Sequence, residues 1–159
     1  MNDAQLIAPA PVVKEVRVKA SPQRAFSVFV DRFGDWWPKS HSVGEAPMAS
    51  AVVESRKGGR FYEVGEDGTE CDWGIVREYS PGEKLVIGWK LNADWAFDND
   101  FEVPVTVTFT ADGAHTIVRL EHSELQRYGE RAGEVAASVG SDGGWPGLLA
   151  AYAVLVEQG

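Results

Sequence analysis

The stretch Trp145–Val156, which reads Trp-Pro-Gly-Leu-Leu-Ala-Ala-Tyr-Ala-Val-Leu-Val, decides the fold because it predicts a helix with no charged side. Apolar side chains recur on one face at the i, i+3, i+4, i+7 spacing, at Trp145, Leu148, Leu149, Tyr152, Leu155 and Val156. The opposite face is also uncharged and consists of Gly147, Ala150, Ala151 and Val154. A helix that is apolar all round is normally covered on both sides. We therefore expect a sheet against one side and the first helix, a loop or a second subunit against the other.

The sheet itself is predicted between residues 49 and 125, where apolar side chains recur mostly at every second position. Strands are expected at about residues 50–55, 59–65, 69–79, 84–91, 102–111 and 115–123. Turn sequences connect them at Asp67-Gly68, Pro81-Gly82 and Asp112-Gly113. Short connections of this kind make consecutive strands antiparallel neighbours.

The N-terminal part of the chain adds one strand and one helix. Residues 1–11 are expected to be a flexible lead-in, and residues 12–159 a single domain. Val12–Ala20 alternates as a half-buried strand, and Ser21-Pro22 then predicts the start of a helix, with Ser21 as its N-cap. Its buried face is expected to carry Phe26, Phe29, Val30 and Phe33. Residues 129–140 are predicted to be a loop or a weak short helix, and Asp142 the cap of the last helix. These elements predict an α+β domain with one antiparallel sheet.

Composition excludes several classes of partner. The net charge is −9, from 24 acidic and 15 basic residues, and a basic surface is required to attract nucleic acid or an anionic membrane. The single cysteine, Cys71, excludes an internal disulfide framework and is expected to be a small buried side chain rather than a nucleophile. The N-terminus has no signal-peptide pattern, and Trp145–Val156 is too short to cross a bilayer, so a cytoplasmic protein is expected.

Six segments occur in the order of a known family: Val12–Phe33, Gly58–Glu63, Glu70–Val76, Leu85–Trp89, Thr116–His122 and Gly143–Trp145. Together they resemble the SRPBCC (START/Bet v 1-like) superfamily and, within it, the homologues of the activator of Hsp90 ATPase. The resemblance implies a helix-grip fold, in which a curved antiparallel sheet of six to seven strands wraps around a long C-terminal helix. It also implies a pocket between sheet and helix. ATPase activity is not expected despite the family name, because no phosphate-binding G-x-x-x-x-G-K-[ST] loop occurs.

Strand alternation indicates which side chains face such a pocket. On the strand at 84–91 the inward residues are Leu85, Ile87 and Trp89, and on the strand at 102–111 they are Val105, Val107 and Phe109. On the strand at 115–123 they are Thr116, Val118, Leu120 and His122. Gly74 is a candidate for a bulge that switches the alternation after Trp73. The expected ligand-binding residues are Trp37, Phe61, Trp73, Ile75, Trp89, Phe109, His122, Trp145, Leu149 and Tyr152. The alternative is a solid core with no room for a ligand.

His122 is the most interesting titratable group, because its alternation places it inward at the end of a strand. It is a polar anchor for a ligand and a weak candidate for proton transfer. Without a second positioned group, a neutral, hydrogen-bonded histidine is the favoured interpretation. His41 and His115 are expected to be solvated.

The acids of the Asp67-Gly68 hairpin are Glu63, Glu70 and Asp72, which could approach one another across it. Hairpin acids usually point to water, so no catalysis is expected from them. No spacing of histidines, acids or Cys71 matches a metal site, and neither a metal nor a cofactor is expected.

The sequence leaves three hypotheses for function. The leading one is non-catalytic binding of a small hydrophobic or amphipathic molecule between the sheet and the last helix. The second is a pocket enzyme of the cyclase, hydratase or hydrolase kind that uses His122. The third is an interaction module, either a co-chaperone or a homodimer that pairs through the uncharged side of the last helix.

Overall fold

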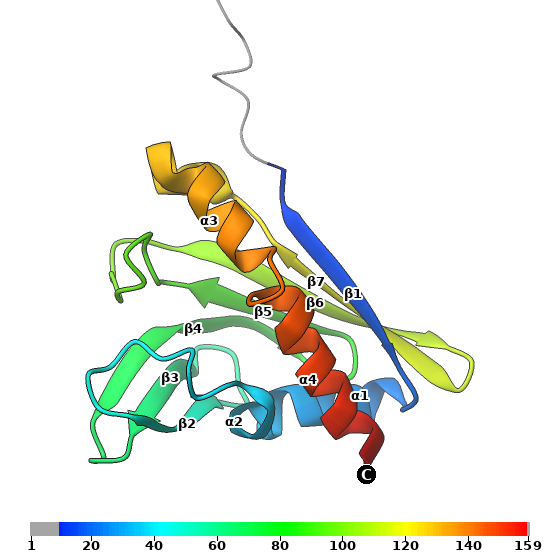
Figure 1. Ribbon diagram of the computed structural model, residues 1–159. Coiled ribbons are helices and arrows are strands. Elements are labelled where there is room, and N and C mark those ends of the chain that lie inside the picture. The colour runs from blue at the N-terminus through cyan, green and yellow to red at the C-terminus, as the bar shows by residue number, and fades with distance from the viewer. Residues whose placement is uncertain (1–9, 159) are drawn as a thin grey trace, which may run out of the picture.

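Strands β1 (Val12–Val18) and β2 (Met48–Val53) follow each other in sequence but lie at opposite edges of one sheet (Figure 1). The computed structural model describes residues 10–158, and within them the strand order is β1-β7-β6-β5-β4-β3-β2. Helices α1 (Pro22–Asp31) and α2 (Phe33–Trp36) carry the chain from one edge to the other. The N-cap predicted for α1 is confirmed, because Ser21 Oγ accepts a hydrogen bond of 3.1 Å from the Arg24 amide.

The other five strands form an antiparallel meander, as the turn sequences predicted. They are β3 (Arg60–Gly65), β4 (Glu70–Ser80), β5 (Lys84–Trp89), β6 (Val103–Asp112) and β7 (His115–His122). Gly68, Gly82 and Gly113 lie in the predicted turns with φ of +86°, +77° and +62°, a region that side chains other than glycine rarely adopt. The predicted inward faces of β5, β6 and β7 are all buried.

Helix α4 (Trp145–Gln158) lies along the concave side of the curved sheet, which confirms the helix-grip fold (Figure 1). Its buried side chains are Trp145, Leu148, Leu149, Tyr152 and Val156, five of the six predicted. Two side chains form hydrogen bonds between α4 and α1. The Tyr152 hydroxyl donates to the Ala25 carbonyl at 2.6 Å, and the Arg24 guanidinium donates to the Val156 carbonyl at 3.0 Å.

The other side of α4 is not covered by the rest of the described chain. Its members Gly147, Ala150, Ala151 and Val154 are exposed, and the side chain of Val154 is 59% accessible. Pairing of two copies of the chain through this surface stays a prediction.

The segment before α4 contains more helix than expected, and the N-terminus of α4 also differs from the prediction. It contains η2 (Leu125–Arg131) and α3 (Ala132–Val139), so the short-helix alternative holds for most of residues 129–140. The Leu148 amide of α4 bonds to the Gly144 carbonyl at 3.1 Å, and within the described chain the Asp142 side chain makes no hydrogen bond to the helix. The prediction of Asp142 as the cap of α4 is wrong, because the helix begins at Trp145 and the residue directly before it is Gly144, which packs tightly against the end of α3. A Cβ there would lie 2.2 Å from the Val139 carbonyl oxygen.

A bulge in the β3–β4 pair decides which side chains of β4 face inward. The register shifts between Phe61 and Tyr62, whose partners are Gly74 and Asp72. Trp73 is buried, and after the bulge Val76 rather than Ile75 takes the buried position. The switch of alternation predicted at Gly74 is confirmed. Only glycine fits there, since a Cβ would lie 2.1 Å from the Gly88 carbonyl oxygen.

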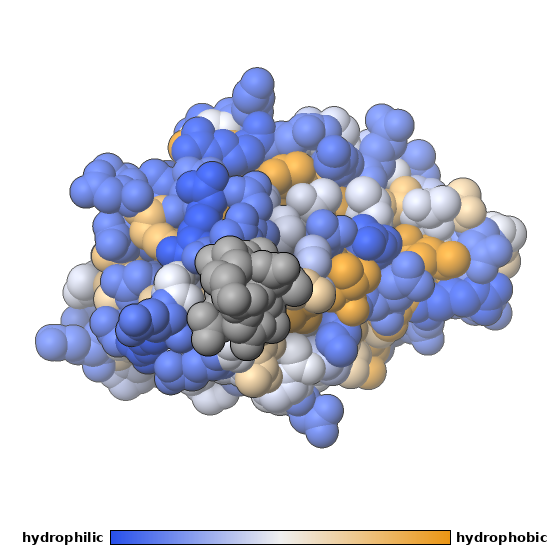
Figure 2. Space-filling model, turned by 90° about the horizontal axis from the view of Figure 1, so that it is seen from above, coloured by the Kyte–Doolittle hydropathy of each residue, from blue (hydrophilic) through white to orange (hydrophobic). Residues whose placement is uncertain are grey.

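The surface agrees with an acidic chain that keeps its apolar residues inside. The face in Figure 2 is largely hydrophilic, with apolar side chains in separate patches. Among residues 10–158 no helix is long and apolar enough to span a bilayer. The predicted lead-in, residues 1–11, lies mostly outside the described residues, and the single-domain boundary at residue 12 stays a prediction.

Candidate ligand-binding cavity

A cavity of about 340 Å³ lies at the N-terminal end of α4, between that helix, the sheet and the loops 38–47 and 90–102. Five of the six tryptophans of the chain contribute to its wall. We call it the tryptophan cavity; it is lined by Trp37, Ser40, His41, Ser42, Val43, Trp73, Trp89, Leu91, Trp95, Ser138, Val139, Gly143, Gly144, Trp145 and Leu148. None of these side chains belongs to Asp, Glu, Lys or Arg, so the lining carries no permanent charge.

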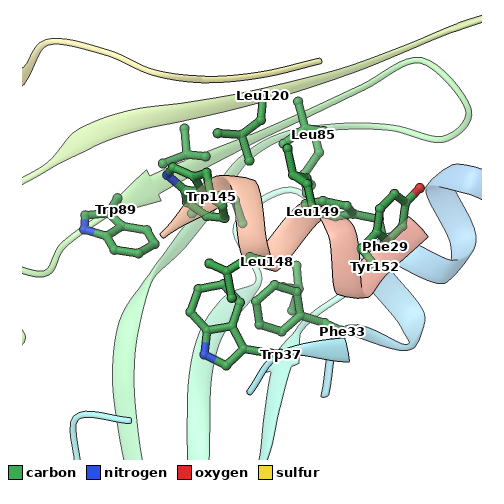
Figure 3. Close-up of a cluster of buried hydrophobic side chains, with 14 of the residues drawn as sticks. Phe29, Phe33, Trp37, Leu85, Trp89, Leu120, Trp145, Leu148, Leu149 and Tyr152 are labelled. Carbon is green, nitrogen blue, oxygen red and sulfur yellow. The ribbon is translucent and has the colours of Figure 1, made fainter. Parts of the chain in front are cut away.

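The tryptophans come from separate elements and pack on one another. Trp37 follows α2, Trp73 lies on β4, Trp89 ends β5 and Trp145 begins α4. Ring centroids are 5.4 Å apart for Trp37 and Trp73, 5.9 Å for Trp37 and Trp145, and 5.8 Å for Trp89 and Trp145. Tilted and edge-on aromatic pairs at such distances are favourable. Figure 3 shows Trp37, Trp89 and Trp145 gathered near the start of α4, with Tyr152 further along the helix.

The 38–47 loop is fixed over the cavity at two points. The His41 Nε2–H donates to the Gly143 carbonyl at 2.7 Å, which joins the loop to the segment before α4. The Val43 amide donates to Glu63 Oε1 at 2.5 Å, which joins the loop to the sheet. The Trp37 indole N–H donates to the His41 carbonyl at 2.9 Å, so this ring is oriented by the same loop.

Glu63 is buried, contrary to the expectation that the hairpin acids point to water. The expectation holds for Glu70 and Asp72, which bind Arg60 at 2.8 Å and 2.7 Å on the exposed face. Glu63 instead faces inward, is 1% exposed, and accepts a hydrogen bond of 2.9 Å from the Trp73 indole N–H. Its cross-strand partner is Cys71. Burial, and then the negative charge of Glu63, raise the pKa of the Cys71 thiol, which makes it a poor nucleophile.

His122 is fully buried and does not contribute to the lining of the cavity. Its Nδ1 accepts a hydrogen bond of 3.1 Å from the Trp145 indole N–H, so Nε2 carries the proton of the neutral ring. Nε2 has no partner in the described part of the chain. Burial lowers the pKa of His122 to about 4, and the ring is therefore neutral at pH 7.

The ten predicted site residues divide into two groups. Trp37, Trp73, Trp89 and Trp145 line the cavity. The other six are part of the surrounding structure: Phe61, Ile75, Phe109, His122, Leu149 and Tyr152.

Packing accounts for these positions. Phe61 lies behind the wall, with its ring 5.1 Å from that of Trp73. Phe109 packs against the rings of α1, 5.1 Å from Phe26. The bulge leaves Ile75 only half-buried, and Leu149 and Tyr152 point into the core beside α1 and α2 rather than into the cavity.

Sequence reasoning missed the loop residues of the wall, of which His41 and Trp95 carry the most chemistry. His41 was expected to be solvated, and although its side chain is exposed it borders the cavity. Trp95 lies in the 90–102 loop, is 39% exposed, and has a left-handed φ of +59°. This conformation is uncommon outside glycine and asparagine. The Asn92 side chain stabilises the loop by accepting bonds from the amides of Asp94 and Ala96, and this asparagine was the available signal of a tight turn.

The rest of the described structure has a second cavity and no cluster of potential metal ligands. A second cavity of about 490 Å³ lies between α1, α2 and β2 and is lined by exposed polar groups, including Asp31, Arg32 and Arg56. Within residues 10–158 no group of three His, Cys, Asp or Glu side chains is placed to hold a metal ion.

The family model described as activator of Hsp90 ATPase homolog 1-like protein matches residues 19–157. The chain belongs to this family. The resemblance inferred from the ordered sequence segments is therefore confirmed. Among curated proteins none matches the sequence.

Solved structures of similar fold include two with closely related sequences. An anthrahydroquino-γ-pyrone synthase, Txn09, is 35% identical, with a TM-score of 0.65 over 93% of this chain and 97% of that one. The self-sacrificing resistance protein CalC from Micromonospora echinospora is 34% identical, with a TM-score of 0.69 over 93% and 94%. The Aha1 dimer from Colwellia psychrerythraea is 14% identical, with a TM-score of 0.62 over 94% and 97%, and shares the fold.

Proposed function

We propose that the chain binds one small hydrophobic or amphipathic molecule in the tryptophan cavity, without catalysing a reaction. The observation that carries this proposal is the convergence of five of the six tryptophans on one cavity. The space of about 340 Å³ has buried indole walls and opens to solvent at the exposed residues His41, Ser42 and Trp95, so a small molecule has access to it. Burial of apolar ligand surface would supply the driving force, at about 25 cal/mol per Å².

The size of the cavity limits the ligand. A dry cavity of about 150 Å³ is large enough for benzene. The tryptophan cavity has about 340 Å³, which suits a body of one or two rings better than a long-chain lipid. Polar groups of the ligand would meet the serine hydroxyls of the lining, at Ser42 and Ser138.

The relatives support an aromatic ligand. Txn09, 35% identical over nearly the whole of both chains, is by name the synthase of an anthrahydroquino-γ-pyrone. A binding site for a ring compound in that protein is consistent with indole walls in this one.

The absence of catalysis is proposed from the arrangement of titratable groups. General acid–base chemistry needs a group within hydrogen-bond reach of the reacting atoms. His122 is neutral, points at Trp145 and does not border the cavity. Glu63 uses Oε1 for two N–H donors of the protein itself. His41 borders the cavity, but its two ring nitrogens bond to the Ser40 hydroxyl and the Gly143 carbonyl.

An enzyme is the second candidate, and the synthase relative is the observation that favours it. In that case His41, not His122, is the titratable side chain on the cavity wall. Conversion of a bound compound would be abolished by His41→Asn, whereas His115→Asn, on a distant hairpin, would leave it unchanged. Recovery of every bound compound unaltered would speak for binding alone.

The experiment that tests the proposal is a ligand screen followed by native mass spectrometry. Aromatic, polyketide-like and lipid compounds are first scored by the thermal shift they cause, because a ligand that binds only the folded state raises the melting temperature. We expect stabilisation by compounds of one or two rings and a one-to-one complex in the mass spectrum. No stabilisation across such a library would refute the proposal.

A further inference from the structure

Glu63 is a buried carboxylate without a cationic partner. The side chain is 1% exposed, and no Lys, Arg or His of the described residues forms an ion pair with it. Its hydrogen bonds come from the Val43 amide and the Trp73 indole, and both are made to Oε1. Oε2 accepts no hydrogen bond from residues 10–158 and lies beside Gly44. Oε2 is not among the fully buried atoms that lack a partner, so it keeps some contact with solvent. Buried charges are normally paired, and this carboxylate has no cation beside it.

The carboxylate lies directly behind the wall of the tryptophan cavity. Both of its donors, Val43 and Trp73, are lining residues. No Asp, Glu, Lys or Arg lies on the lining itself, and Glu63 is a charged group joined to the wall by two hydrogen bonds. In surroundings of low dielectric its negative potential is only weakly screened.

Four of the five tryptophan rings of the wall have their indole N–H groups turned elsewhere and present carbon to the cavity. The indole N–H groups of Trp37, Trp73 and Trp145 donate to the His41 carbonyl, Glu63 and His122. The N–H of Trp89 is buried away from the open space. Aromatic faces carry negative charge density, and cages of such rings bind quaternary ammonium groups.

We propose that the tryptophan cavity selects a cationic ligand, a tertiary or quaternary ammonium group on a small aromatic or aliphatic body, over a neutral molecule of the same shape. The inference rests on the proposed function, since it specifies the ligand of the same cavity. Ring faces attract the cation at short range, and Glu63 supplies the opposite charge behind the wall. The net charge of −9 acts in the same direction at longer range.

The test compares two isosteric probes by isothermal titration calorimetry at about pH 8, where an ordinary imidazole is neutral. The probes are para-(trimethylammonio)benzyl alcohol and para-tert-butylbenzyl alcohol, which differ only in the charge of the branched group. We expect the cation to bind about tenfold more tightly, the advantage of a desolvated cation–π contact. The corresponding anionic probe, para-sulfobenzyl alcohol, is expected to bind most weakly.

The variant Glu63→Gln keeps an acceptor for the two N–H donors and removes the charge. It is expected to lower the preference for the cation, measured as the ratio of the two dissociation constants in the same variant, to about threefold or less. The matched control is Glu70→Gln, which removes a carboxylate from the exposed face of the same hairpin and keeps the preference. If Glu63→Gln does not fold, the order of the three probes on the unmodified protein decides the question.

The outcomes separate this inference from the proposed function. Equal or tighter binding of the tert-butyl probe by the unmodified protein overturns the cation preference while leaving the binding cavity in place. An unchanged preference in Glu63→Gln also overturns it. Failure of both uncharged and cationic probes to bind overturns the inference and the proposed function together.

Discussion

The indole N–H of Trp145 donates a hydrogen bond of 3.1 Å to Nδ1 of His122, and both side chains are buried. The bond joins the first residue of α4 to the last residue of β7. It therefore fixes the orientation of one cavity wall relative to the sheet. It also uses the only lone pair of the neutral imidazole, which leaves His122 as a structural rather than a chemical group.

The burial of His122 predicts that the stability of the protein depends on pH. The pKa of His122 is lowered by burial to about 4, against about 6.5 for an exposed histidine, so below pH 6.5 the unfolded chain binds more protons than the folded one. The stabilisation is complete above about pH 6.5 and is lost as the pH falls towards about 4. Between pH 7.5 and 4.5 the free energy of unfolding should fall by roughly 2–3 kcal/mol from this group.

The measurement is urea-induced unfolding at both pH values for the natural protein and for His122→Asn, which cannot titrate. Carboxylates contribute equally to both proteins, so the difference between their pH slopes isolates the histidine. An identical slope in the two proteins would show that the imidazole is not kept neutral by burial.

Glu63 is predicted to hold the 38–47 loop in place. In Glu63→Ala the Val43 amide and the Trp73 indole lose their acceptor, and each unsatisfied buried donor costs about 1–3 kcal/mol. Hydrogen exchange of the Val43 amide should accelerate more than that of Gly58, whose amide bonds to the Val76 carbonyl at 2.8 Å. Glu70→Ala, which breaks an exposed ion pair, should cost about 1 kcal/mol or less. Equal acceleration at Val43 and Gly58 would show that Glu63 is not a local anchor.

Two glycines should respond to alanine in opposite directions. Gly74→Ala places a Cβ 2.1 Å from the Gly88 carbonyl oxygen in the β4–β5 pair, and we expect a loss of about 3 kcal/mol or more. Gly133 lies in α3 with no atom within 4 Å of the added Cβ, so Gly133→Ala should raise stability by about 0.5–1 kcal/mol. Denaturant unfolding of both variants decides this, and tolerance of alanine at position 74 would contradict the close approach of the two strands.

The regular elements could be predicted because their signals are local. Alternation indicated the strands, the turn glycines indicated the antiparallel order, and Gly74 indicated the bulge. The apolar helix Trp145–Val156 indicated what fills the concave side of the sheet. The prediction of its buried face was correct for five of six residues. The sixth, Leu155, is only half-buried because it lies at the margin of the contact between helix and sheet.

The candidate cavity was less predictable, because its wall combines residues whose proximity depends on the loops. Four tryptophans were named from alternation and spacing, but His41, Trp95 and the burial of Glu63 follow from how two loops close over the sheet. Alternation also could not distinguish a ring that borders open space from one packed a turn further along. An example is the pair of adjacent leucines on α4: both are buried, but Leu148 lines the cavity and Leu149 packs in the core.

The central claim is that the tryptophan cavity binds a small ring compound. The most direct measurement is a titration with 2-(dimethylamino)-6-propionylnaphthalene, a neutral two-ring probe whose emission shifts to the blue in apolar surroundings. Three proteins are compared: the natural chain, Trp37→Phe and Trp36→Phe. Trp36 is the matched control, because it is equally buried and its ring packs on that of Trp37 at 5.9 Å, but it does not line the cavity. We predict saturable one-to-one binding, weakened about three- to tenfold in Trp37→Phe and within about twofold of normal in Trp36→Phe. The absence of saturable binding, or equal losses in both variants, would contradict the account.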